Sequence, residues 1–177
     1  MHVTAEAVSA TLTTCRNCTI EISNISEHYC LINPKVFLSS GFCQHPPQPT
    51  IRSMKSGVCS FVKDEDFPTG AVGVLTYDLF HTHTRSCTER MAIMFSVPYD
   101  YNLYENRLAV GVFEQSCACD ENLYDLMYDG EEPCNFVRSE NIGSGLEYLA
   151  PNVDLRATMS SIGKAIIKME LYDKLGR

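Results

Sequence analysis

Apolar and polar positions alternate with a period of two in several segments of the chain. Near the C-terminal end of the sequence, four apolar residues share one face: Ala165, Ile167, Met169 and Leu171. Successive side chains of a strand point to opposite faces, so this pattern predicts a half-buried β-strand. Segment 19–23 has the same pattern, with Ile20 and Ile22 on one face.

Four further segments, 58–62, 70–80, 91–97 and 108–113, are rich in β-branched and aromatic residues. Segment 91–97 is almost continuously apolar, which is typical of a strand buried on both faces. Turn-forming stretches lie between the strands: the proline-rich 45–49, the charged 64–68 and the Gly-Ser-Gly at 143–145. Many short strands joined by such turns predict an all-β sandwich.

One segment has helical spacing instead. Asp120 is a good N-cap for residues 121–128, and Gly130 follows at the position where such a helix ends. Tyr124 and Tyr128 are four residues apart and therefore share one face of this helix.

Composition fits a single globular domain over residues 1–177, of which residues 1–14 form a short N-terminal segment. The chain is 45% hydrophobic and 20% charged, with a formal net charge of −8. An acidic chain is repelled by phosphate backbones and anionic bilayers, so nucleic acid is not an expected partner. A zwitterionic lipid surface is compatible with this charge.

The chain is expected to be soluble. Its first residues have no basic start and no sustained apolar run, so no secretory signal peptide is expected. No stretch approaches the roughly 18 apolar residues of a membrane helix. An odd number of cysteines, nine, favours mostly reduced thiols in a protein that is cytosolic or released without a leader.

Few residues point to catalysis or metal binding. Cys15 and Cys18 form a C-x-x-C without a second pair, and His81 and His83 share a face with no third ligand evident. We interpret the histidines as part of an exposed loop. Nucleophile elbows, phosphate loops and dinucleotide turns are absent, so neither an enzyme nor a cofactor or metal is expected.

Tyrosines give the strongest local signal. Tyr99, Tyr101 and Tyr104 lie within six residues at the end of a buried strand, and the helix adds Tyr124 and Tyr128. Tyrosine rings attract a quaternary ammonium through cation–π interactions, and their hydroxyls can reach a phosphate. The alternative is that these rings belong to the core or to an ordinary surface.

The run Met94–Tyr104 resembles the strand-and-loop signature of actinoporins, the pore-forming cytolysins of sea anemones, which have relatives in other animals and in plants. Segments 37–41, 69–75 and 123–128 resemble three further parts of that family, in the same order along the chain. The resemblance implies an all-β sandwich flanked by one or two short α-helices. It also implies binding to the phosphocholine headgroup of sphingomyelin, insertion of an N-terminal helix, and assembly of several protomers into a cation-conducting pore.

The family's headgroup pocket carries over residue by residue. It would comprise Ser40, Val72, Ser96, Pro98, Tyr104, Tyr124 and Tyr128, with Tyr101 as a neighbour. The tyrosines would enclose the ammonium and hydrogen-bond the phosphate. The family's membrane-interface loop would carry over to Arg107 and Leu108.

The sequence departs from the family in three ways. Only fourteen residues precede Cys15, and a helix of that length reaches roughly 21 Å, against a hydrocarbon core about 30 Å thick. The chain has no tryptophan, so the aromatic anchors of the interface loop are missing. Asp129 stands where the family has a further tyrosine.

The sequence therefore keeps most of the residues expected to recognise a lipid headgroup, whereas the parts expected to insert into the membrane are weak. The first hypothesis is a protein that binds sphingomyelin or phosphatidylcholine at a membrane surface, forms pores only if it assembles as a homo-oligomer, and has a weakened lytic step. The alternative is a non-lytic, lectin-like module that binds glycans or another partner on the same fold. The third hypothesis is a metal or thiol protein that uses Cys15, Cys18, His81 and His83.

Overall fold

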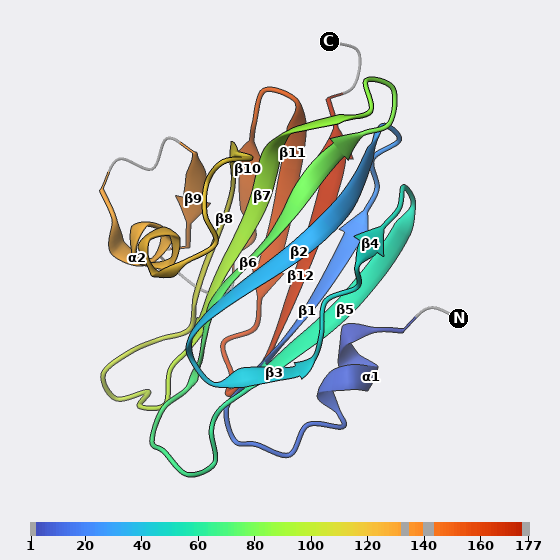
Figure 1. Cartoon of the computed structure of the whole chain (residues 1–177). Coiled ribbons are helices and arrows are strands. Elements are labelled where there is room, and N and C mark those ends of the chain that lie inside the picture. The colour runs from blue at the N-terminus through green and yellow to red at the C-terminus, as the bar shows by residue number, and fades with distance from the viewer. Residues whose placement is uncertain (1–2, 132–134, 140–143, 175–177) are drawn as a thin grey trace.

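The fold consists of two six-stranded sheets that pack face to face (Figure 1). It is known from a computed structural model that describes residues 3–131, 135–139 and 144–174. The first sheet has the order β10 (Leu146–Leu149), β11 (Val153–Met159), β12 (Lys164–Asp173), β1 (Asn17–Asn24), β5 (Lys55–Val62) and β3 (Phe42–His45). The second has the order β4 (Thr50–Ile51), β2 (Tyr29–Ser40), β6 (Ala71–His81), β7 (Ser86–Val97), β8 (Arg107–Glu114) and β9 (Phe136–Arg138). These sheets confirm the predicted β-sandwich.

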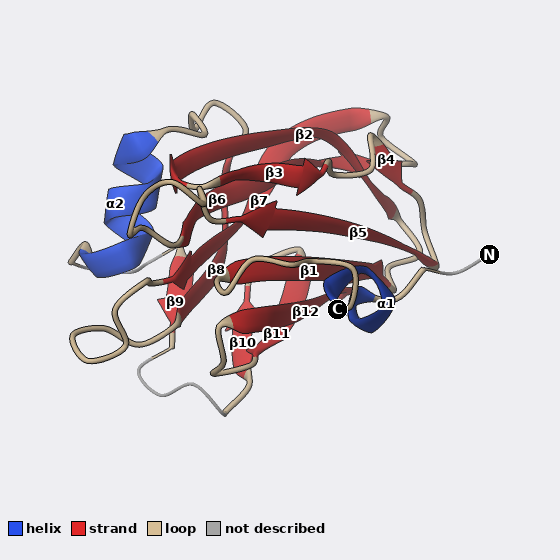
Figure 2. Cartoon of the chain, turned by 90° about the horizontal axis from the view of Figure 1, so that it is seen from below, coloured by secondary structure: helices blue, strands red, loops and turns tan. Residues whose placement is uncertain are grey.

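Two short helices flank the sandwich, α1 (Ala5–Ser9) and α2 (Glu121–Asp129). Figure 2 shows them on opposite sides of the molecule. Nearly all neighbouring strands are antiparallel, but β1 and β12 run parallel in the middle of the first sheet. The fold class predicted from the sequence is thus confirmed together with its helices.

The main core fills the space between the sheets. The predicted inward faces are confirmed: Ala165, Ile167, Met169 and Leu171 are all fully buried. Phe61 of β5 and Phe95 of β7 stack across the interface with ring centres 4.8 Å apart. Residues of both sheets belong to this one cluster, which fixes the two sheets against each other.

The helix α1 covers the outer face of the first sheet. Its first amide, on Ala5, donates to Oε1 of Glu21 at 2.8 Å, and Glu6 forms an ion pair with Lys168 at 2.7 Å. Glu21 therefore becomes buried although it lies on the polar face of β1. The alternation around Ile20 and Ile22 predicted a strand correctly, but it could not show that a helix covers the other face.

The helix α2 covers the outer face of the second sheet. Asp120 is its N-cap, accepting from the amide of Leu123 at 3.0 Å, and Gly130 follows its last residue, as predicted. Gly130 has an ordinary φ of −64°, so a left-handed cap is not the reason for glycine here. A Cβ at this position would lie 2.5 Å from the carbonyl oxygen of Leu126. Because α2 covers β7, residues 91–97 are buried on both faces, as their continuous apolar pattern predicted.

Candidate functional site

Four residues proposed from the sequence lie in one row across the second sheet. In the strand register, Ser40 is opposite Val72, Val72 is opposite Ser96, and Ser96 is opposite Arg107. Directly opposed side chains lie on the same face, with neighbouring strands about 4.8 Å apart. The row faces outward, because Val72 packs against the cluster beneath α2, whereas its neighbour Ala71 belongs to the main core.

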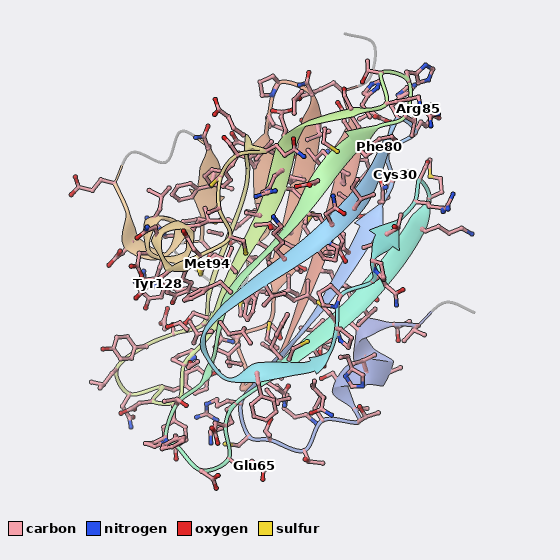
Figure 3. The ribbon with its side chains drawn as sticks, in the orientation of Figure 1. Cys30, Glu65, Phe80, Arg85, Met94 and Tyr128 are labelled. Atoms are coloured by element: carbon pink, nitrogen blue, oxygen red, sulfur yellow. The ribbon has the colours of Figure 1, made fainter. Side chains whose placement is uncertain are left out.

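The two tyrosines of α2 lie beside this row. Tyr124 and Tyr128 have ring centres 5.6 Å apart and an interplanar angle of 33°. Tyr124 is buried and Tyr128 is half-buried, both against a cluster that includes Met94 (Figure 3). We call Ser40, Val72, Ser96, Tyr124 and Tyr128 the aromatic site.

Burial raises the pKa of the Tyr124 hydroxyl well above its usual value, and the neighbouring Tyr128 phenol, once ionised, and the carboxylates of Asp125 and Asp129 act in the same direction. A hydrogen bond with Ser96 opposes this shift in the pKa but does not cancel it. Tyr124 therefore keeps its proton at neutral pH, so its hydroxyl remains a donor for an anionic oxygen.

Two arginines close the C-terminal end of α2. Arg138 donates to the carbonyl oxygens of Met127 at 2.8 Å, Leu126 at 3.1 Å and Gly130 at 3.0 Å. Arg107 donates to the carbonyl of Tyr128 at 3.2 Å and places its guanidinium 4.7 Å from the centre of the Tyr128 ring. The last carbonyls of a helix lack partners within it and carry partial negative charge, so these cations stabilise the end that presents Tyr128.

A surface cavity of about 540 Å³ lies next to these arginines. Its lining comprises Leu103, Tyr104, Glu105, Asn106, Arg107, Arg138 and Ser139. Tyr104 is more than half exposed at the cavity wall. Arg107 thus links the aromatic site to a cavity that is lined by a tyrosine, two guanidinium groups and one carboxylate, that of Glu105. The two guanidinium groups are the donors suited to an anion there.

Pro98 and Tyr101 contact a different part of the chain. The carbonyl of Pro98 accepts from Nε of Arg16 at 2.9 Å, and the Arg16 guanidinium lies 4.4 Å from the centre of the Tyr101 ring. The Tyr101 hydroxyl donates to Asn106 at 2.7 Å. Within the described residues, no ring contact joins Tyr101 or Tyr104 to Tyr124 or Tyr128. The structure therefore brings together only part of the set taken from the sequence.

Leu108 requires a correction as a residue of the membrane-interface loop. It is the second residue of β8, is only 1% exposed and belongs to the core between the sheets. Its side chain cannot reach a bilayer while the sandwich is closed. Arg107, its neighbour, is half-buried and faces outward.

Sequence reasoning missed a concentration of exposed apolar side chains at one end of the sandwich. The loops after β5, β7 and β11 all lie at this end, and they expose Phe67 at 59%, Leu103 at 71% and Ile162 at 61%. Asn106 ties two of these loops together by donating to the carbonyls of Ser160 and Ile162. We call this surface, which also includes Phe42, Tyr99 and Tyr104, the apolar end. No sequence signal joins Phe67, Leu103 and Ile162, because they lie in three loops that are far apart along the chain.

The C-x-x-C does not form a joint thiol site. Cys15 is exposed, whereas Cys18 is fully buried in β1, where burial raises the pKa of its thiol. Cys134 lies outside the described residues.

No helix within the described residues is both long and apolar enough to cross a bilayer.

Comparison with known proteins assigns the chain to a family. Residues 37–173 match the family described as sea anemone cytotoxic protein. DELTA-actitoxin-Aeq1a of Actinia equina is 34% identical over 106 residues, which cover 58% of this chain and 44% of that protein. DELTA-thalatoxin-Avl1b of Actineria villosa is 41% identical over 96 residues, which cover 54% of this chain and 38% of that protein. The matched part thus spans less than half the length of these relatives.

A solved structure supports the fold independently. The lipid-binding protein Nakanori superposes with a TM-score of 0.73 over 96% of this chain and 79% of its own, at 12% sequence identity. At that identity the likeness concerns the fold alone.

Proposed function

Because the chain belongs to the sea anemone cytotoxic protein family, we propose that this actinoporin-like protein binds membranes through choline-type lipid headgroups and acts as a single, non-catalytic domain. The observation that carries the proposal is the position of the aromatic site. It lies on the second sheet beside Arg107, which leads to the cavity at the apolar end. Three features thus lie side by side on the surface: an aromatic surface for a cation, a guanidinium for a phosphate and apolar loops for the bilayer.

The aromatic site has the chemistry for both halves of phosphocholine. The Tyr124 and Tyr128 rings offer a π-surface to the quaternary ammonium. The hydroxyls of Tyr124 and Ser96, and the guanidinium of Arg107, are donors for the phosphate oxygens. Sphingomyelin and phosphatidylcholine share this headgroup and are the proposed lipids.

Arg107 would change partner when a headgroup binds. Its guanidinium lies 4.7 Å from the Tyr128 ring centre, where an ammonium would compete for the same aromatic ring. The hydrogen bond from Arg107 to the Tyr128 carbonyl is long at 3.2 Å, so its loss costs little. A phosphate beside the ring would attract the guanidinium away from it and free the ring for choline.

The apolar end gives the orientation on the membrane. Phe67, Leu103 and Ile162 lie on three separate loops at the same end of the sandwich, and exposed apolar patches of this kind mark interaction surfaces. The formal charge of −8 favours a zwitterionic bilayer over an anionic one. We infer that this end meets the bilayer and that α1, on the outer face of the first sheet, contributes nothing to the first contact.

Pore formation is a separate step in this proposal. The α1 helix has five residues, and Ala5 and Glu6 fasten it to the first sheet. Headgroup binding requires neither release of this helix nor a homo-oligomer. Vesicle binding and leakage of vesicle contents are therefore expected to be separable.

Co-sedimentation with vesicles of different composition tests the proposal. We expect binding to sphingomyelin and phosphatidylcholine vesicles, and at least tenfold weaker binding to vesicles in which a choline-free zwitterionic lipid replaces them. Equal binding to both kinds would reject the headgroup site. A saturable glycan signal without any lipid binding would favour the lectin-like alternative instead.

A further inference from the structure

Three histidines from two separate turns meet at the end of the sandwich opposite the apolar end. His28 lies between β1 and β2, His81 is the last residue of β6, and His83 lies in the turn between β6 and β7. Their ring centres are 5.1 Å apart for His28 and His83, 5.9 Å for His81 and His83, and 6.1 Å for His28 and His81. Figure 3 shows this end with Phe80 and Arg85, which flank the second turn.

Backbone hydrogen bonds hold the two turns together. The carbonyl of His28 accepts from the amide of Thr82 at 2.9 Å and from the Thr82 hydroxyl at 3.2 Å. Because Thr82 separates His81 from His83, this link keeps all three histidines within reach of one another. The amide of Arg85 donates to the carbonyl of His81 at 2.8 Å and closes the second turn.

A carboxylate lies behind one of the rings. Oδ1 of Asp173, at the end of β12, is 3.5 Å from Nδ1 of His28, and its other oxygen accepts from the amide of Glu27. A carboxylate beside one imidazole nitrogen orients the ring and leaves the other nitrogen for a metal ion, as in many protein metal sites. The Tyr29 ring lies edge-on to His81 with centres 5.0 Å apart and supports that ring from the core side.

We propose that His28, His81 and His83 form a binding site for a divalent transition metal ion of the zinc class. Imidazole nitrogens bind such ions at about 2.0–2.1 Å, and three of them leave a fourth position for water. Rings that share an ion at that distance have centres roughly 5 Å apart, close to the separations in the structure. Asp173 is then a positioning residue for His28.

The rings must turn to bind the ion. Among the described residues, no group of three or more histidine, cysteine, aspartate or glutamate side chains is placed to hold a metal ion as it stands. The His28 side chain is 45% exposed and His83 is exposed, so both can turn in solvent. Turning His81 breaks the hydrogen bond of 3.2 Å from the Thr84 amide to its Nδ1, an exposed contact that water can replace.

The thiols of Cys30 and Cys87 lie near the histidines and are the alternative ligands for a metal ion. Cys30 and Cys87 are both opposite Phe80 in the strand register. Phe80 immediately precedes His81, and successive side chains of a strand point to opposite faces. These two thiols therefore lie on the other face of the sheet from His81.

Zinc titration by calorimetry on the reduced full chain tests the proposal. We expect one equivalent of Zn²⁺, with affinity lowered at least about tenfold in His28→Ala and in His83→Ala. The matched control is His45→Ala, which should bind zinc as the wild type does. His45 lies on β3 and is hydrogen-bonded to Ser60. Thermal unfolding without metal verifies that each variant is folded.

Cobalt absorption separates histidine from thiol ligation. The wild type should bind Co²⁺ without a thiolate charge-transfer band, and a Cys30→Ser/Cys87→Ser variant should give the same spectrum. Absence of stoichiometric zinc, equal affinity in wild type and histidine variants, or a thiolate band that the serine variant removes would each overturn the proposal. Because the histidines lie at the end opposite the apolar end, lipid binding of these variants is a separate readout and does not decide the metal site.

Discussion

The tyrosines that the sequence analysis singles out have different roles in the structure. Tyr124 and Tyr128 face each other on α2 beside Ser96. Tyr101 instead holds Arg16 and Asn106, and so fastens the loop after β7 to the start of β1. The tyrosines are thus divided between the proposed headgroup surface and a structural joint.

Leu103 and Leu108 allow an exposed residue of the apolar end to be compared with a residue of the core. Leu108→Ala removes a buried side chain and should lower the free energy of unfolding by about 2–5 kcal/mol. Leu103→Ala removes an exposed one and should change stability by less than about 0.5 kcal/mol while weakening vesicle binding. Urea unfolding and co-sedimentation check both. The control is Leu149→Ala, because Leu149 is an exposed leucine on β10. If Leu103→Ala and Leu149→Ala lower vesicle binding equally, the proposed orientation of the apolar end toward the bilayer is wrong.

At the scale of elements, the position of α2 depends on residues outside the helix. Arg138, on β9, donates to three carbonyls at its C-terminal end. Arg138→Ala removes these three hydrogen bonds, although the Leu126 carbonyl keeps the amide of Gly130, and should lower the free energy of unfolding by roughly 1–3 kcal/mol. It should also weaken vesicle binding, because the end of the helix presents Tyr128. Unchanged vesicle binding in a folded Arg138→Ala variant would show that the helix end is not needed for recognition.

A buried ion pair joins β6 to β7 beneath the loop that leads to α2. Asp78 and Arg90 are 2.9 Å apart, and Asn33 and Gln115 also donate to the carboxylate. Burial acts to raise the pKa of Asp78, but the hydrogen bonds from Arg90, Asn33 and Gln115 outweigh it and hold the pKa below its usual value. A lowered pKa contributes stability above the unfolded-state value, and that contribution is lost as the pH falls below about 4.

Asp78→Asn tests this pair. The variant should be less stable than the wild type at pH 7 by roughly 3–5 kcal/mol, since Arg90 stays buried without its carboxylate. It should also lose less stability between pH 5 and pH 3, because it no longer has the titrating group. Urea unfolding across this pH range measures both, and parallel losses in the two proteins would exclude Asp78 as a source of the acid sensitivity.

Much of the architecture follows from local patterns, and the exceptions have physical causes. Period-two alternation located β1 and β12, β-rich or continuously apolar runs located β6, β7 and β8, and capping residues located α2. The pattern of 108–113 already placed Leu108 in a strand, whereas the family resemblance placed it in a loop; the pattern was right. The short helix α1 and the edge strands β3, β4, β9 and β10 have too few residues for a periodic signal.

The candidate sites show the same limit. Sequence resemblance found the row from Ser40 to Ser96 and the tyrosines of α2, but it could not show that Arg107 lies over Tyr128. His28 is more than 50 residues from His81 in the sequence, so only the paired turns bring a third imidazole into view. Contacts between distant loops are set by the packing of the sheets, which local periodicity does not encode.

At the scale of the whole molecule, the proposed membrane-binding surface and the histidine turns lie at opposite ends of the sandwich. The apolar end and the aromatic site lie together, α1 covers the outer face of the first sheet, and the histidine turns lie at the opposite end. One core cluster with residues of both sheets connects them, so binding of a headgroup at one end need not disturb the other. The account therefore depends on whether one particular aromatic surface recognises choline lipids.

Co-sedimentation with sphingomyelin vesicles, measured side by side for the wild type, Tyr128→Ala and Tyr172→Ala, tests this claim most directly. Tyr172 is a matched control, because it is also half-buried with an arginine over its ring, Arg156 at 5.1 Å, but lies on the first sheet. The account predicts that Tyr172→Ala binds like the wild type and that Tyr128→Ala binds at least about tenfold more weakly while unfolding at a similar temperature. Equal binding by all three proteins would contradict it.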